Sequence, residues 1–160
     1  MRRRRQTKYI VVHCSATPPS SDIGADEIDD MHERRGFNNG DGIHIGYAQV
    51  ICRDGTIEFG RHYDEPGEHV KGKNYQSVGI CLVGGVDENG NPENNYTDAQ
   101  LDALHETLHF LKRAYTGAEI LGHRDLSPDL NGDGIVQRNE WLKECPCFDV
   151  RLWLKTETDL

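Results

Sequence analysis

The stretch "TDAQLDALHETLHFLKRAY", residues 97–115, places the strongest constraint on how this chain can fold. Its leucines recur at helical spacing, at positions 101, 104, 108 and 111, and form one apolar stripe. Thr97 and Gln100 have the spacing of a capping box, which predicts a helix that begins directly after Thr97. Because such a stripe must be buried, the rest of the chain has to supply an apolar surface that covers it.

Short runs rich in β-branched residues can supply that surface. "KYIVVHCSA", "SVGICLVGG" and "AEILGH" are each predicted to be a buried strand, and "IGYAQVICRDGTIEFGR" to be two strands joined at the Asp54-Gly55 turn. Further helices are predicted at "ADEIDDMHERRGF", where Ile28, Met31 and His32 share a face, and at "FDVRLWLK". Strands that alternate with helices predict an α/β fold, in which one domain has a mixed central β-sheet flanked by helices.

Positive charge is concentrated at the start of the chain. The segment "MRRRRQTK" holds five of the 18 lysines and arginines, whereas the formal net charge of the whole chain is −9. We expect residues 1–7 to be a basic disordered tail and residues 8–160 to form the domain. The acidic balance makes a nucleic-acid partner unexpected.

Hydropathy and cysteine content indicate the cellular compartment in which the protein is made. No apolar run approaches the roughly 20 residues that a membrane span needs. The apolar stretch after the tail is too short for the core of a signal peptide, so we expect synthesis in the cytoplasm without one. Five cysteines form an odd set that suits reduced thiols. We also expect a monomer.

The letters "HETLH" within the long helix match the H-E-x-x-H motif of zinc proteases. His105 and His109 would lie on a flank of the helix, about 90–130° from the leucine stripe. The extended form of the motif needs glycine and histidine where this chain has Lys112 and Tyr115. We therefore interpret "HETLH", including Glu106, as surface sequence and keep the protease as a third interpretation.

Two other histidines each end a predicted strand. His13 and His123 are followed by polar residues, and side chains at the ends of neighbouring strands can meet at one edge of a sheet. Cys145 lies in the turn sequence "KECPCFD". Two histidines and a cysteine form a three-ligand zinc set that leaves the fourth position for water. Taken alone, either histidine would be as readily a core or surface residue.

Several short motifs, taken together and in order, resemble the type-2 N-acetylmuramoyl-L-alanine amidases. The resemblance covers about residues 8 to 155, and it implies the fold that these amidases share with the peptidoglycan recognition proteins. The family includes small phage amidase endolysins. The motifs are "VHCSAT", "IGYAQVICRDGTIEFGR", "HVKGKN", "SVGICLVGG", "GHRDLSPD" and "KECPCFD".

This resemblance implies a function and a set of site residues. The function is zinc-dependent hydrolysis of the amide between N-acetylmuramic acid and L-alanine, which degrades the bacterial cell wall. The implied roles are zinc ligands for His13, His123 and Cys145, a catalytic pair of Tyr47 and Lys143, and a place near the substrate groove for His69 and Asn74. The motif register favours Cys145 over Cys147 as the third ligand.

The chemistry of amide hydrolysis agrees with those roles. Zinc lowers the pKa of bound water to about 7 and polarises a carbonyl. The positive charge of Lys143 would stabilise the developing oxyanion, and Tyr47 would position the water or relay a proton.

Residues 129–140, "DLNGDGIVQRNE", fit the EF-hand calcium-loop pattern and look like an insertion between the second and third zinc ligands. We predict that calcium stiffens this insertion and fixes where Lys143 and Cys145 project. The sequence offers oxygen ligands at Asp129, Asn131, Asp133, Ile135 (through its carbonyl) and Glu140.

The main alternative to hydrolysis is a regulator of the same fold that binds peptidoglycan or an RNA polymerase without catalysis. The arginine-rich tail would serve a polymerase contact. For the enzyme, we expect an endolysin that waits in the cytoplasm and acts on the cell wall after release.

Overall fold

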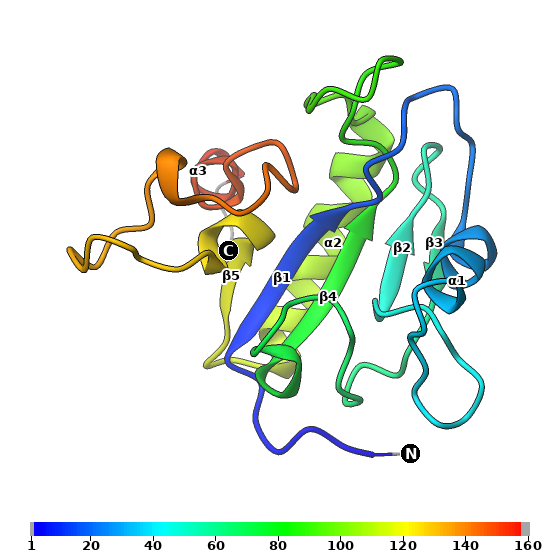
Figure 1. Cartoon of the computed structure of the whole chain (residues 1–160), viewed down its shortest axis with the longest axis horizontal. Coiled ribbons are helices and arrows are strands. Elements are labelled where there is room, and N and C mark those ends of the chain that lie inside the picture. The colour runs from blue at the N-terminus through cyan, green and yellow to red at the C-terminus, as the bar shows by residue number, and fades with distance from the viewer. Residues whose placement is uncertain (1, 158–160) are drawn as a thin grey trace.

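A computed structural model describes residues 2–157 and shows a five-stranded mixed sheet at the centre of the chain (Figure 1). The strand order is β3-β2-β4-β1-β5. Strand β1 runs parallel to both β4 and β5, and β2 runs parallel to β4 but antiparallel to β3. The strands are β1 (Tyr9–Cys14), β2 (Gln49–Ile51), β3 (Ile57–Phe59), β4 (Ser77–Leu82) and β5 (Glu119–Gly122).

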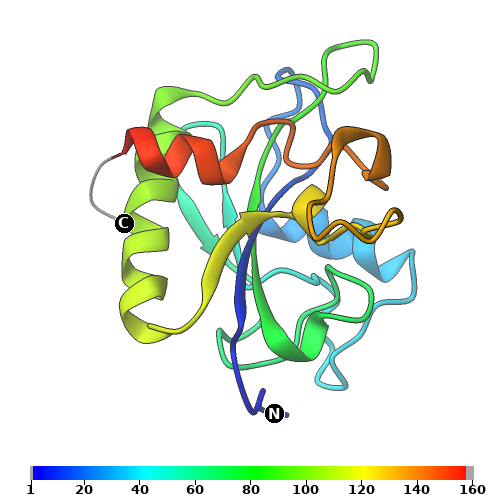
Figure 2. The same ribbon diagram turned by 90° about the vertical axis from the view of Figure 1, so that its left-hand side faces the viewer.

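Helices cover both faces of this sheet. Figure 2 shows α2 on one side of the sheet and α1 on the other, and α3 packs near β5. The helices are α1 (Ala25–Glu33), α2 (Asp98–Ala114) and α3 (Val150–Thr156), with short 3-10 turns η1 (Asn74–Gln76), η2 (His123–Leu126) and η3 (Arg138–Glu140). The predicted α/β class with a mixed, helix-flanked sheet is confirmed. None of the described helices is long and apolar enough to span a membrane.

The predicted capping box and leucine stripe of α2 are both present. The backbone N–H of Gln100 donates to the hydroxyl of Thr97, and the N–H of Thr97 donates to the Gln100 side chain. Leu104, Leu108 and Leu111 are fully buried and belong to the largest apolar cluster. That cluster explains why a helix of this length is stable here, since burying each leucine contributes roughly 1.5–3 kcal/mol.

The alternation of side chains along β1 decides on which face of the sheet His13 lies. Ile10 and Val12 belong to the cluster beneath α2, whereas Val11 packs on the opposite face with Val70 and Leu121. Because successive side chains of a strand point to opposite faces, His13 lies on the same face as Val11, away from α2.

The start of the chain makes specific contacts at Arg4. Its backbone N–H donates to the carbonyl of Asp64 at 2.6 Å, and its guanidinium donates to the carbonyls of Tyr63 at 2.5 Å and Glu65 at 2.8 Å. Met1 lies outside the described residues. Disorder of residues 1–7 stays a prediction, and these contacts tie the middle of that segment to the loop after β3.

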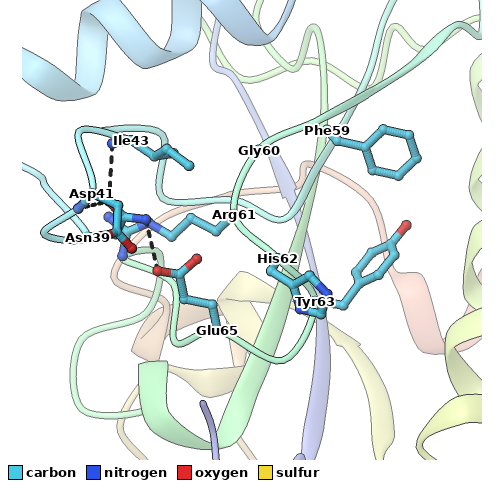
Figure 3. A pocket seen from close by; sticks show the side chains of 9 residues that line it. All are labelled: Asn39, Asp41, Ile43, Phe59, Gly60, Arg61, His62, Tyr63 and Glu65. Atoms are coloured by element: carbon cyan, nitrogen blue, oxygen red, sulfur yellow. Dashed lines mark hydrogen bonds between the residues drawn. The ribbon is translucent and has the colours of Figure 1, made fainter. Parts of the chain in front are cut away.

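A hollow of about 500 Å³ lies beside the end of β3 (Figure 3). Its walls include the exposed ring of Phe59, and the Asn39 amide donates to the Glu65 carboxylate at 2.9 Å. None of the residues predicted for zinc or for the substrate groove lines it.

Candidate active site

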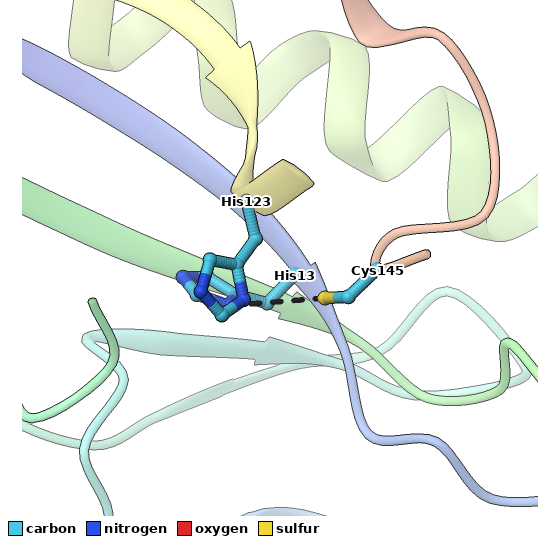
Figure 4. Close-up of side chains that lie close together, drawn as sticks. All are labelled: His13, His123 and Cys145. Atoms are coloured by element: carbon cyan, nitrogen blue, oxygen red, sulfur yellow. Dashed lines mark hydrogen bonds between the residues drawn. The ribbon is translucent and has the colours of Figure 1, made fainter. Parts of the chain in front are cut away.

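The three predicted zinc ligands come together at one edge of the sheet (Figure 4). His13, His123 and Cys145 offer ligand atoms that all lie within 4.8 Å of one another. Among residues 2–157 this is the one group of three or more histidine, cysteine or acidic side chains close enough to hold a metal ion.

Strand pairing brings the two histidines together. His13 lies at the carboxyl end of β1, and Val12 pairs with Gly122, the last residue of β5. His123 follows Gly122 directly, so both rings leave the sheet at the same level. Their centroids are 4.6 Å apart.

Backbone contacts from both neighbouring segments hold Cys145. The backbone N–H of Cys14 donates to its Sγ at 3.2 Å, and the N–H of Arg124 donates to its carbonyl at 2.9 Å. Its Sγ therefore lies 3.9 Å from Nδ1 of His13. Cys147 points elsewhere, since its thiol donates to the carbonyl of Gly85 at 3.1 Å.

Burial keeps both histidines neutral. Burial is the main cause that lowers the pKa of His13 well below its ordinary value, and the neighbouring His69 ring also disfavours its protonation. Burial and the charge of Lys143 lower the pKa of His123 to about 4. Neutral imidazole is the form that can bind a metal ion.

These ligands form part of a groove with a volume of about 760 Å³. Its walls come from α1, from the loops that follow β1 and precede β2, and from the segment that ends at Cys145. The groove includes all seven residues that were predicted for zinc, catalysis and substrate: His13, Tyr47, His69, Asn74, His123, Lys143 and Cys145.

The predicted catalytic pair lies next to the ligands. The ring centroid of Tyr47 is 5.0 Å from that of His13, and burial raises the pKa of this phenol well above its ordinary value. Tyr47 is therefore a protonated hydrogen-bond donor at neutral pH. Lys143 is close enough for its charge to contribute to the lowered pKa of His123.

His69 and Asn74 also line the groove, but their hydrogen bonds face inward. Nδ1 of His69 lies 2.7 Å from Nε2 of His13. The side-chain oxygen of Asn74 accepts from the backbone N–H groups of His69 and Val70, both at 2.9 Å.

His32 also lines the groove, although no role was predicted for it from the sequence. It is buried, its Nδ1 accepts from the backbone N–H of Gly46 at 2.8 Å, and its ring centroid lies 5.3 Å from that of Tyr47. Its place on the apolar face of the predicted helix was the available signal, because a histidine that faces inward needs a partner.

The "HETLH" histidines lie on α2, the helix that covers the other face of the sheet. The ring centroids of His105 and His109 are 6.3 Å apart, and neither residue belongs to the metal-binding group. The protease interpretation therefore has no support in the described structure.

The calcium prediction also finds no support. The buried carboxylate of Glu140 accepts the backbone N–H groups of Leu130 and Asn131 at one oxygen and of Gln137 at the other. The Asp129 carboxylate likewise accepts the N–H groups of Gly132 and Gly134. The acidic side chains of residues 129–140 thus bind their own loop, and the described chain shows no metal-binding group there.

The mixed α/β sheet carries two neutral histidines and a cysteine in one groove, and these are the ligand types of an open zinc site. A family model described as N-acetylmuramoyl-L-alanine amidase matches residues 3–146. The chain therefore belongs to the N-acetylmuramoyl-L-alanine amidase family, and it is an amidase of peptidoglycan.

Individual relatives agree with this family. The endolysin of Klebsiella phage KP32 is 44% identical over 151 residues, which are 94% of this chain and 87% of that protein. The endolysin of Enterobacteria phage K11 is 43% identical over 154 residues, 96% of this chain and 89% of that protein. Among solved structures, the N-acetylmuramoyl-L-alanine amidase LysC from Clostridium intestinale URNW matches with a TM-score of 0.71 and 25% identity, over 95% of this chain and 85% of that chain.

Proposed function

We propose that this amidase is a zinc-dependent endolysin that cuts the amide between the lactyl group of N-acetylmuramic acid and L-alanine. The observation that carries the proposal is the convergence of His13, His123 and Cys145 within 4.8 Å in a groove that also holds Tyr47 and Lys143. The similarity to phage endolysins supports a role in cell-wall lysis.

The donor set fits zinc. Two neutral imidazoles and a cysteine thiolate are the ligand types of an open catalytic zinc site, and His13 is buried in a setting that disfavours its protonation. When bound, zinc lowers the pKa of a water molecule to about 7 and polarises the substrate carbonyl.

Tyr47 and Lys143 add a hydrogen-bond donor and a positive charge to the metal site. The protonated phenol of Tyr47 lines the groove, where it would donate a hydrogen bond to the attacking water or to the amide. The ammonium group of Lys143 lines the same groove, where its positive charge would stabilise the oxyanion that forms from the carbonyl oxygen.

The charge of the groove suits a peptide with free carboxylates. Arg34, Arg35, Lys71 and Lys143 line it, and its acidic side chain, Glu68, forms an ion pair with Arg61. A peptidoglycan stem peptide carries such carboxylates, so the groove attracts the part of the substrate on the L-alanine side of the cut.

Mass spectrometry of the soluble products from purified peptidoglycan tests this function. We expect wild-type enzyme to release stem peptides with a free N-terminal L-alanine, and Cys145→Ala to release none. Cys147→Ala is the matched control, because it removes a thiol two residues away that points out of the ligand group. Intact peptidoglycan with zinc-loaded wild type would contradict the proposal and favour a binding role.

A further inference from the structure

A chain of hydrogen bonds leads from His13 away from the groove and ends at a main-chain carbonyl. Nε2 of His13 lies 2.7 Å from Nδ1 of His69, and Nε2 of His69 lies 3.2 Å from Oγ of Ser77. The Ser77 hydroxyl donates to the carbonyl of Lys73 at 2.8 Å. Three side chains and one carbonyl thus connect the candidate metal site to the start of β4.

The last acceptor fixes the direction of every proton in this chain. A carbonyl oxygen can only accept, so the single hydroxyl hydrogen of Ser77 is used there. Oγ of Ser77 must then accept from Nε2–H of His69. A neutral His69 that is protonated on Nε2 has its lone pair on Nδ1, which therefore accepts from Nε2–H of His13.

The consequence for His13 is a defined tautomer. With its proton on Nε2, the lone pair of His13 lies on Nδ1, the atom that faces Sγ of Cys145 at 3.9 Å. A histidine that donates its other N–H to a partner has its ring orientation and its ligating nitrogen fixed.

The surroundings of His69 are built to hold its ring. A Cβ added to Gly79 would lie 2.8 Å from Cγ of His69, and one added to Gly67 would lie 2.6 Å from its Cδ2. Two glycines therefore leave the space that the ring fills. Asn74 fixes the backbone at His69, and Ser77 is completely buried.

We propose that His69 and Ser77 are positioning residues that hold His13 in its Nε2–H tautomer and so present Nδ1 to the metal. This inference rests on the proposed zinc function for its consequence, but the direction of the hydrogen bonds is a property of the protein alone. His69, which the family resemblance places near the substrate, thereby acts through the metal ligand.

The direct test is nitrogen-15 NMR of the histidine rings in the full-length, zinc-free wild-type protein at neutral pH. Long-range couplings distinguish a protonated from an unprotonated ring nitrogen. We expect both His13 and His69 to be protonated on Nε2. This measurement needs neither a variant nor bound metal.

Variants connect the tautomer to metal affinity. We expect Ser77→Ala to remove the preference of His69 for Nε2–H and to weaken zinc binding about 10- to 100-fold in competition with a chromophoric chelator, the usual cost of losing such a partner. His69→Phe keeps a ring but offers no acceptor, and should weaken zinc binding at least as much. Thr107→Val is the matched control. It removes a buried hydroxyl on α2 that accepts from the Gln49 side chain at 2.8 Å, on the other face of the sheet. It should leave the histidine tautomers and the zinc affinity unchanged.

Three experimental results would overturn different parts of the proposal. Tight zinc binding by a wild-type protein whose His13 is protonated on Nδ1 would overturn the inference and leave the proposed function in place. Unchanged tautomers and affinity in Ser77→Ala would overturn the inference as well. The expected tautomers in a protein that binds zinc no better than Cys145→Ala would overturn the zinc function, and with it the positioning role.

Discussion

Sγ of Cys145 lies 3.9 Å from Nδ1 of His13, although 132 positions separate the two residues in the chain. The contact closes the domain, because it joins the end of the first strand to a loop near the C-terminus. The same contact places that loop over the edge of the sheet, where Cys145 lies beside His13 and His123.

The first prediction separates the two neighbouring thiols. Because the Cys145 thiol faces His13 and the Cys147 thiol donates to Gly85, Cys145→Ala should lose zinc and amidase activity while Cys147→Ala keeps both. Zinc content by atomic absorption and turbidity loss of cell-wall suspensions measure the two effects. Equal loss of zinc in both variants would contradict the assignment.

Removal of the Tyr47 hydroxyl should affect catalysis rather than metal binding. The Tyr47→Phe ring still fills its place 5.0 Å from His13, but it lacks the hydroxyl that donates beside the metal ligands. We expect a fall in kcat of about 100-fold or more with zinc content unchanged, in the range usual for a general acid or base. A variant that keeps wild-type kcat would show that the phenol takes no part in the reaction.

Loss of the Lys143 charge should act on the transition state. Lys143→Met keeps most of the side-chain volume and removes the ammonium group, so we expect kcat to fall about 100- to 1,000-fold with little change in KM. Lys143→Arg provides the comparison that retains charge, and it should recover part of the rate. A large rise in KM with normal kcat would instead assign Lys143 to substrate binding.

Much of the sheet could be predicted because its signals are local. The β-branched runs, the Asp54-Gly55 turn and the capping box at Thr97 each depend on residues within a few positions, and the structure contains all three. The meeting of His13 and His123 could also be predicted, because both lie at or just beyond the carboxyl ends of strands. In the structure those strands, β1 and β5, pair with each other.

Other parts of the site depend on contacts that no local pattern encodes. The bond from His69 to Ser77 joins a loop to the first residue of β4, and His32 reaches Gly46 from a different element. The calcium prediction had a local signal, but spacing alone does not say whether carboxylates will face an ion or backbone N–H groups. In the structure, the carboxylate of Glu140 faces those N–H groups.

Glu140 should therefore matter for stability without any added ion. Its carboxylate accepts three backbone N–H groups, and Glu140→Ala would leave them without this acceptor. We expect the free energy of unfolding to fall by about 1–3 kcal/mol in buffer that contains a calcium chelator. Glu140→Gln, which keeps one acceptor oxygen, should lose less. A wild-type melting temperature that rises with calcium, and does not rise in Glu140→Ala, would restore the calcium prediction.

The final prediction concerns acid stability and His32. Burial, followed by the charges of Arg35 and Arg61, lowers the pKa of His32 to about 4 in the folded protein, whereas an unfolded histidine has a pKa of about 6.5. Between these values the unfolded chain binds more protons, so the free energy of unfolding falls as the pH drops from about 6.5 to about 4. Protonation also removes the lone pair with which Nδ1 accepts from Gly46.

Urea denaturation of the zinc-free protein at pH 7.5 and pH 4.5 measures this dependence. Other buried histidines contribute in the same direction, so His32→Gln should flatten the dependence without abolishing it. Glutamine can still accept from Gly46 but takes up no proton in this range. If wild type and His32→Gln lost equal stability between the two pH values, His32 would not be one of the groups that make the fold sensitive to acid.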